Sequence, residues 1–109
     1  MSATDVCSCV SEIVPCARLA WPVGKAPELP WAVYFQSDDN TFMADDSRFT
    51  QSTRWCVELY ERYSDAALED ALEAAIEGRF GPYETSESWI DSEGCYMLAI
   101  YFTEFEGSL

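Results

Sequence analysis

The sequence contains no histidine, a single lysine, only five glycines and no long apolar run. Without histidine, the chain lacks the usual general base and the commonest metal ligand. The glycines are scattered, so no glycine-rich phosphate loop is present. No apolar run approaches the roughly 18 residues of a membrane-spanning helix. These shortages argue against the common nucleotide-dependent, metal-dependent and membrane-spanning functions.

Basic residues are also scarce, since six lysines and arginines stand against 20 acids, for a formal net charge of −14. Contacts with nucleic-acid phosphates need clustered cations, so we expect no direct sequence-specific nucleic-acid binding. Three interpretations of the acidity stay open: solubility alone, a basic protein partner, or the wall of a channel through which DNA passes without sticking.

What the sequence does have is apolar residues, at 49%, including 15% aromatics, which is typical of a folded chain. Its 109 residues predict a single domain, 1–109. The first ten residues are polar and include an acid, which is not the pattern of a signal peptide. We therefore expect a protein that is intracellular when made.

The five cysteines do not predict a disulfide framework, because their number is odd and the chain is expected inside the cell. Cys56 and Cys95 lie in apolar strand patterns and are expected as small core residues. Cys7, Cys9 and Cys16 lie close in sequence, but a zinc site there would need a fourth ligand from elsewhere. We expect neither a metal nor a cofactor.

The apolar periodicity predicts an α+β chain, with a central, mostly antiparallel sheet of about four to five strands and two flanking helices. The helices are expected at Asp5–Val14, capped by Thr4 or Asp5 and ended by Pro15, and at Asp65–Glu77, capped by Ser64 and stopped by Gly78. The candidate strands are Ala17–Trp21, Trp31–Gln36, Thr41–Ala44, Arg48–Arg62, Tyr83–Ile90 and Cys95–Phe105. Turns are expected at 37–40, 45–47 and 91–94, and irregular segments at 22–30 and 79–82.

The last strand is apolar on both faces, with Tyr96 on one and Tyr101 on the other. An antiparallel strand usually has one wet face, and two helices can cover only one side of a sheet. A neighbouring subunit would cover the other, which makes both tyrosines interface candidates. Two alternatives stay open: the helices divide between the two faces, or the tyrosine hydroxyls remain in water.

The loop before the long strand places an apolar pair between two acidic turns, an arrangement typical of an interface anchor ringed by charge. Its candidate contact residues are Asp38, Asp39, Phe42, Met43, Asp45, Asp46 and Arg48. Adjacent acids diverge, so they do not form an acid–base pair, and we expect no catalytic residues and no enzyme activity. The alternative for Phe42 is that it folds back under the sheet.

Several segments in succession carry a family resemblance: 24–30, Trp31–Phe35, 37–40, 42–45, 57–60, the acid-flanked helix Asp65–Glu77, Tyr83–Ile90 and 92–96. Over nearly the whole chain they resemble a small protein of the head–tail module of long-tailed bacteriophages and prophages, called tail completion, tail terminator or minor tail component.

The resemblance implies a tail-terminator-like fold and a structural role without catalysis or cofactor. Related proteins form hexameric rings that stop polymerisation of the major tail tube protein and face the head connector. It therefore implies homo-oligomers that assemble in the bacterial cytoplasm and end at the head–tail junction of the virion, with the loop 38–48 on the binding face. An acidic ring lumen, lined by Glu69, Glu73 or the acids of this loop, would let DNA slide past.

Other functions remain as alternatives. An acidic decoy that mimics DNA and blocks a nucleic-acid-binding host protein would fit the net charge. A head–tail connector component would fit the same phage module. A small regulatory or ligand-binding domain would need an apolar pocket with a few convergent polar groups.

Overall fold

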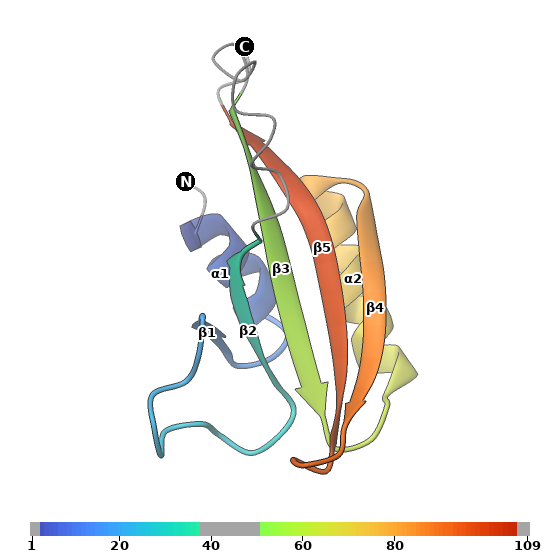
Figure 1. Ribbon diagram of the computed structural model, residues 1–109. Coiled ribbons are helices and arrows are strands. Elements are labelled where there is room, and N and C mark those ends of the chain that lie inside the picture. Colours follow the sequence, from blue (N-terminus) through green and yellow to red (C-terminus); the bar gives the residue numbers. More distant parts are fainter. Residues whose placement is uncertain (1–2, 38–50, 107–109) are drawn as a thin grey trace.

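The computed structural model describes residues 3–37 and 51–106. The elements in these ranges (Figure 1) are α1 (Ala3–Ser11), β1 (Cys16–Arg18), β2 (Trp31–Gln36), β3 (Gln51–Glu61), α2 (Ala66–Phe80), β4 (Tyr83–Ile90) and β5 (Cys95–Glu106). The α+β class expected from the sequence is confirmed, with one mostly antiparallel sheet and two helices.

The strands form one sheet in the order β1-β2-β3-β5-β4. β1 runs parallel to β2, and every other neighbouring pair is antiparallel. β3 and β5 share the longest register, from Gln51 opposite Glu106 to Glu61 opposite Tyr96. Both strands are rich in aromatic and aliphatic residues that fit a pleated, buried surface. They form the centre of the sheet, while β1 and β4 form its edges.

Both helices pack on one face of the sheet, behind it in the view of Figure 1, and they contact each other. The molecule therefore has two layers, and the alternative in which the helices divide between the faces is wrong. The core between the layers consists of Val6, Cys9, Val10, Val14, Ala32, Tyr34, Trp55, Val57, Leu59, Leu72, Ile76, Leu98, Ile100 and Phe102. These residues recur at helical spacing in the helices and at alternate positions in the strands. Each large aliphatic among them contributes about 1.5–3 kcal/mol by burial.

The start of α2 differs from the expectation by its capping residue. Asp65, rather than Ser64, is the N-cap, and its carboxylate accepts a hydrogen bond from the backbone N–H of Leu68 at 3.2 Å. The Ser64 hydroxyl instead donates to Glu69 at 3.0 Å. Either side chain can cap a helix, so the choice depends on where the chain leaves β3.

The end of α2 also differs, because Gly78 lies inside the helix and does not stop it. The helix continues to Phe80, so the expected linker at 79–82 begins too early. The stop is Gly81, which has φ 101° and donates its N–H to the carbonyl of Glu77 at 2.9 Å. A glycine inside a helix costs only about 1 kcal/mol, so the next glycine can serve as the terminus.

α1 includes Thr4 and Asp5, so neither residue caps it, and it ends at Ser11, before the expected stop at Pro15. Pro15 instead begins the parallel pairing of β1 with β2, because its carbonyl accepts the N–H of Ala32 at 2.9 Å. β1 ends at Arg18, earlier than the expected Trp21, since Leu19 has φ 67° and leaves the extended region.

The expected strands Trp31–Gln36 and Tyr83–Ile90 and the turn at 91–94 are confirmed. The long strand is confirmed over Gln51–Glu61, and the last strand runs one residue further, to Glu106. The expected strand Thr41–Ala44 and the turn at 45–47 lie outside the described residues. Across residues 3–37 and 51–106, neither helix has the length and apolarity that crossing a membrane requires.

Candidate functional site

The face of the sheet opposite the helices carries a band of apolar and aromatic side chains, here named the open face. The register places Trp31 beside Tyr60, Phe35 beside Cys56, and Cys56 beside Tyr101. Trp31, Phe35, Tyr60, Met97 and Tyr101 are half-buried, whereas Val33, Cys56 and Ala99 are buried. Neither α1 nor α2 covers this band, and an apolar surface of this kind is typical of a protein-contact site.

A connector, residues 19–30, returns the chain from β1 to β2 and lies against one end of the open face. The ring of Trp21 meets that of Trp31 edge-on, with centroids 6.0 Å apart and planes at 69°. The ring of Trp31 lies 4.8 Å from that of Tyr60. Together with Val33 and Glu58 these rings line a cavity of about 360 Å³, which we name the aromatic pocket.

Glu58 brings a carboxylate into this aromatic surrounding. Its Oε1 accepts a hydrogen bond from the hydroxyl of Tyr60 at 2.7 Å. Burial, together with this bond, raises the pKa of Tyr60 above its ordinary value, so the hydroxyl remains a donor. Within the described ranges Glu58 has no basic side chain as a partner. The pocket thus combines three rings with one negative charge that nothing in these ranges neutralises.

The rim of the aromatic pocket is apolar and exposed. Val23, in the connector, is 100% exposed and Leu19 is 68% exposed. Exposed aliphatic side chains beside half-buried rings extend the open face outward. This end of the face therefore offers both an apolar contact area and a polar anchor.

An ion pair lies at the other end of the open face. Arg54 donates to Glu84 Oε1 at 2.9 Å and to the hydroxyl of Thr103 at 3.3 Å. Its guanidinium also lies 5.8 Å from the ring centroid of Tyr101. At this end the cation is already held by an acid and a ring of the same chain.

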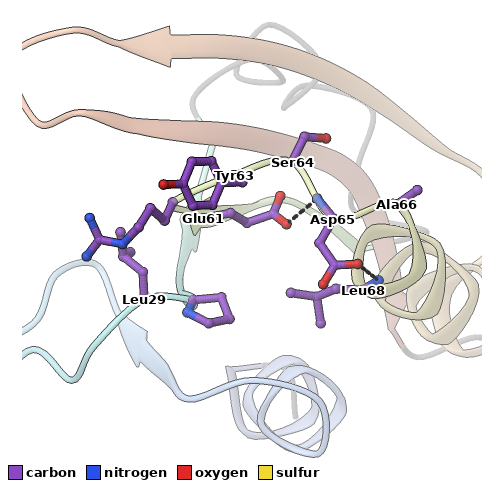
Figure 2. Close-up of a pocket in the computed structure, with 9 residues that line it drawn as sticks. Leu29, Glu61, Tyr63, Ser64, Asp65, Ala66 and Leu68 are labelled. Atoms are coloured by element: carbon purple, nitrogen blue, oxygen red, sulfur yellow. Dashed lines mark hydrogen bonds between the residues drawn. The ribbon is translucent and has the colours of Figure 1, made fainter.

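A second cavity, of about 450 Å³, lies where β3 leads into α2, and we name it the junction pocket. Figure 2 shows it between Leu29 of the connector and the segment from Glu61 to Leu68. Glu61 is only 2% exposed, and its Oε1 accepts the backbone N–H of Asp65 at 3.0 Å. Its Oε2 is buried and has no hydrogen-bond partner in the described structure.

Burial, together with the neighbouring carboxylates of Glu69 and Asp65, raises the pKa of Glu61 to about 8. The side chain is therefore mostly protonated at neutral pH. Its hydrogen bond ties the end of β3 to the first residue before α2. This geometry supports a structural role for Glu61 in fixing the β3–α2 junction.

The cysteines lie where the strand patterns indicated. Cys56 and Cys95 are buried, as the strand patterns indicated, and no disulfide joins any two of the five cysteines. Burial, with a smaller effect of Cys7, raises the pKa of Cys16 to about 12. Residues 3–37 and 51–106 contain no group of three or more Cys, Asp or Glu side chains placed to hold a metal ion.

The structure does not bring the two predicted interface tyrosines together, since they lie on opposite faces of β5. Tyr101 belongs to the open face. Tyr96 lies on the helix side, where its hydroxyl donates to Glu87 at 2.6 Å. The other predicted contact residues, Asp38, Asp39, Phe42, Met43, Asp45, Asp46 and Arg48, lie outside the described residues.

The aromatic pocket is a site that sequence reasoning did not single out. One signal for it is Trp21, a large aromatic in a proline-rich connector. Another is Glu58, the one acid in the otherwise apolar stretch Trp55–Tyr60. Their meeting depends on the pairing of Trp31 with Tyr60, which joins two strands that are far apart in the sequence. A pattern within one strand does not contain that information.

Comparison with known proteins gave no match: no family model, no curated protein and no solved structure matches the chain.

Proposed function

We propose that this protein is a subunit of a ring that closes the head-proximal end of a phage or prophage tail tube and joins it to the head connector. Copies of the chain meet one another in the ring, and the major tail tube protein and the connector are its other partners. Assembly takes place in the bacterial cytoplasm, and the ring ends at the head–tail junction of the virion.

The observation that carries this proposal is the open face, a band of half-buried apolar side chains on the side of the sheet that α1 and α2 leave uncovered. A subunit of such a ring needs contact surfaces for other copies and for the tube and connector proteins, beyond the surface that its own helices cover. The segment-by-segment resemblance to tail-completion proteins supports the phage setting.

Light scattering coupled to size-exclusion chromatography tests the assembly directly. We expect a particle of six times the 12.3 kDa chain mass, either for the protein alone or after it is mixed with the tube protein. Electron microscopy of the mixture should show tubes of limited length. A chain that stays a monomer in both samples, with tubes that keep growing, would contradict the proposal.

A matched pair of variants connects assembly to the open face. Met97→Glu puts a charge at a half-buried position of the open face, beside Tyr60, so it should weaken assembly at least about tenfold. Ala74→Glu adds the same charge at an exposed position of α2, so it should leave assembly unchanged. If Met97→Glu remains folded by circular dichroism and still assembles normally, the open face is not the contact surface.

A further inference from the structure

We propose that the aromatic pocket binds the side chain of an arginine that a basic partner protein presents to the open face. The inference deepens the docking function proposed above and rests on it for the partner being a protein. The geometry of the rings, the position of Glu58 and the charge of the chain each support it.

The rings provide a surface suited to a flat cation. Trp21, Trp31 and Tyr60 are successive neighbours, with centroid separations of 6.0 and 4.8 Å. A cation over the face of a tryptophan or tyrosine within about 6 Å of its centroid is attracted by the ring quadrupole. The cavity beside these rings has a volume of about 360 Å³, which is ample for one long side chain.

Glu58 selects the charge of the occupant. The Tyr60 hydroxyl engages one oxygen of the carboxylate, and within the described residues no cation pairs with it. A half-buried carboxylate without a counter-charge favours a ligand that brings one.

Arginine fits better than lysine, because its planar guanidinium stacks on rings while it donates two parallel hydrogen bonds to a carboxylate. The chain already places arginine side chains beside aromatic rings elsewhere. Arg54 is held between Glu84 and the ring of Tyr101, and Arg18 lies within 6 Å of two ring centroids, those of Tyr34 and Trp55. The aromatic pocket offers the same combination of ring and carboxylate without a cation of its own in the described ranges.

The net charge of the chain indicates the source of this arginine. A second copy would bring −14 of like charge, and two of its arginines, Arg54 and Arg79, already pair with Glu84 and Asp5. A basic protein would be attracted at long range and fits the acidity better.

A further feature favours a polypeptide over a small free cation. The fully exposed Val23 and the largely exposed Leu19 give an incoming chain an apolar rim to cover.

The test uses the full chain and three peptides of sequence Gly-Gly-X-Gly-Gly with blocked ends, where X is arginine, citrulline or trimethyllysine. Nuclear magnetic resonance follows the indole N–H signals of Trp21 and Trp31. We expect saturable shifts with the arginine peptide and at least about tenfold weaker binding of the citrulline peptide, which has the same shape but no charge. Equal binding of these two, or stronger binding of trimethyllysine, would overturn the proposal.

Variants locate the binding. Glu58→Gln keeps the shape of the side chain and the hydrogen bond to Tyr60 but removes the charge. It should therefore weaken binding of the arginine peptide at least about tenfold. Trp21→Leu should weaken it as well, and it lies in the connector outside the core. Glu77→Gln, which removes an exposed acid on α2, is the matched control and should bind like the wild type. Wild-type affinity in Glu58→Gln would overturn the assignment even if Trp21→Leu fails to fold.

The two proposals fail in different ways. If the chain caps tubes but does not distinguish arginine from citrulline, only the arginine site is wrong. If the arginine peptide binds as expected but the chain never assembles with the tube protein, the phage role is wrong and the pocket remains.

Discussion

Glu61 is a buried acid whose protonation is linked to folding. Its pKa is raised from an ordinary value of 4.5 to about 8, first by burial and then by the carboxylates of Glu69 and Asp65. The folded chain therefore holds this proton more tightly than the unfolded chain does. The resulting contribution to stability is full below about pH 4.5 and is lost as the pH rises through the folded pKa near 8.

This linkage predicts how Glu61→Gln behaves. The amide keeps an acceptor for the N–H of Asp65 but cannot ionise, so the variant should be more stable than the wild type at pH 9. The difference in free energy of unfolding between the variant and the wild type should shrink by up to about 1.4 kcal/mol per pH unit as the pH falls toward 5. Urea unfolding at several pH values measures it.

Glu77→Gln serves as the control for this experiment, because Glu77 is exposed on α2. It should follow the wild-type stability curve at each pH. If the stability of Glu61→Gln and of the wild type changes with pH in parallel, the pKa of Glu61 is the same in the folded and the unfolded chain, which would contradict this prediction.

Among single residues, those whose environment is set within one strand were predictable. Cys56 and Cys95 follow the alternation of β3 and β5 and are buried as expected. Tyr96 and Tyr101 were assigned to opposite faces of β5, and the structure agrees. The role of Glu58 was not predictable, because it depends on the neighbouring strand and on the connector above it.

At the scale of elements, the two glycines near the end of α2 predict opposite effects of one substitution. Gly78→Ala should stabilise the protein by about 0.5–1 kcal/mol, because the position is helical and nothing lies within 4 Å of the added methyl group. Gly81→Ala should destabilise it by about 1–3 kcal/mol, because φ 101° and ψ −151° strain any residue with a Cβ. Thermal unfolding of both variants measures the difference, and equal effects would contradict the assignment of Gly81 as the cap.

The same helix shows how far local sequence patterns determine element boundaries. The apolar stripe placed α2 correctly, and Leu72 and Ile76 are buried as it requires. The predicted cap and stop of this helix were wrong because the sequence offers two candidates for each. Ser64 or Asp65 can be the N-cap, and Gly78 or Gly81 can end the helix. The parallel pairing of β1 was likewise not predictable, since it depends on contacts with a strand beyond the connector.

At the scale of the whole molecule, the two-layer arrangement predicts a gradient of local stability. β3 and β5 pair with each other along their length, and each also has a second neighbour. β1 is a three-residue edge strand with one partner. Amide hydrogen exchange should therefore be slowest in β3 and β5 and much faster in β1. Protection of Ala17 equal to that of Val57 would contradict this.

The net charge of −14 also belongs to the whole molecule, and it argues against a phosphate-binding surface of clustered cations. Composition alone does not indicate which kind of partner the acidic residues would contact. The structure adds that one of these acids, Glu58, lies among three rings at one end of the open face.

A strand that runs parallel to its neighbour cannot be joined to it by a tight turn, so the chain has to travel back before the second strand begins. Here residues 19–30 make that return without a helix, and most of their side chains are exposed. Only Trp21 of this segment makes a ring contact with the sheet, while Val23 points freely into solvent. Substitutions at Val23 would therefore change the contact surface proposed above with little effect on the stability of the sheet.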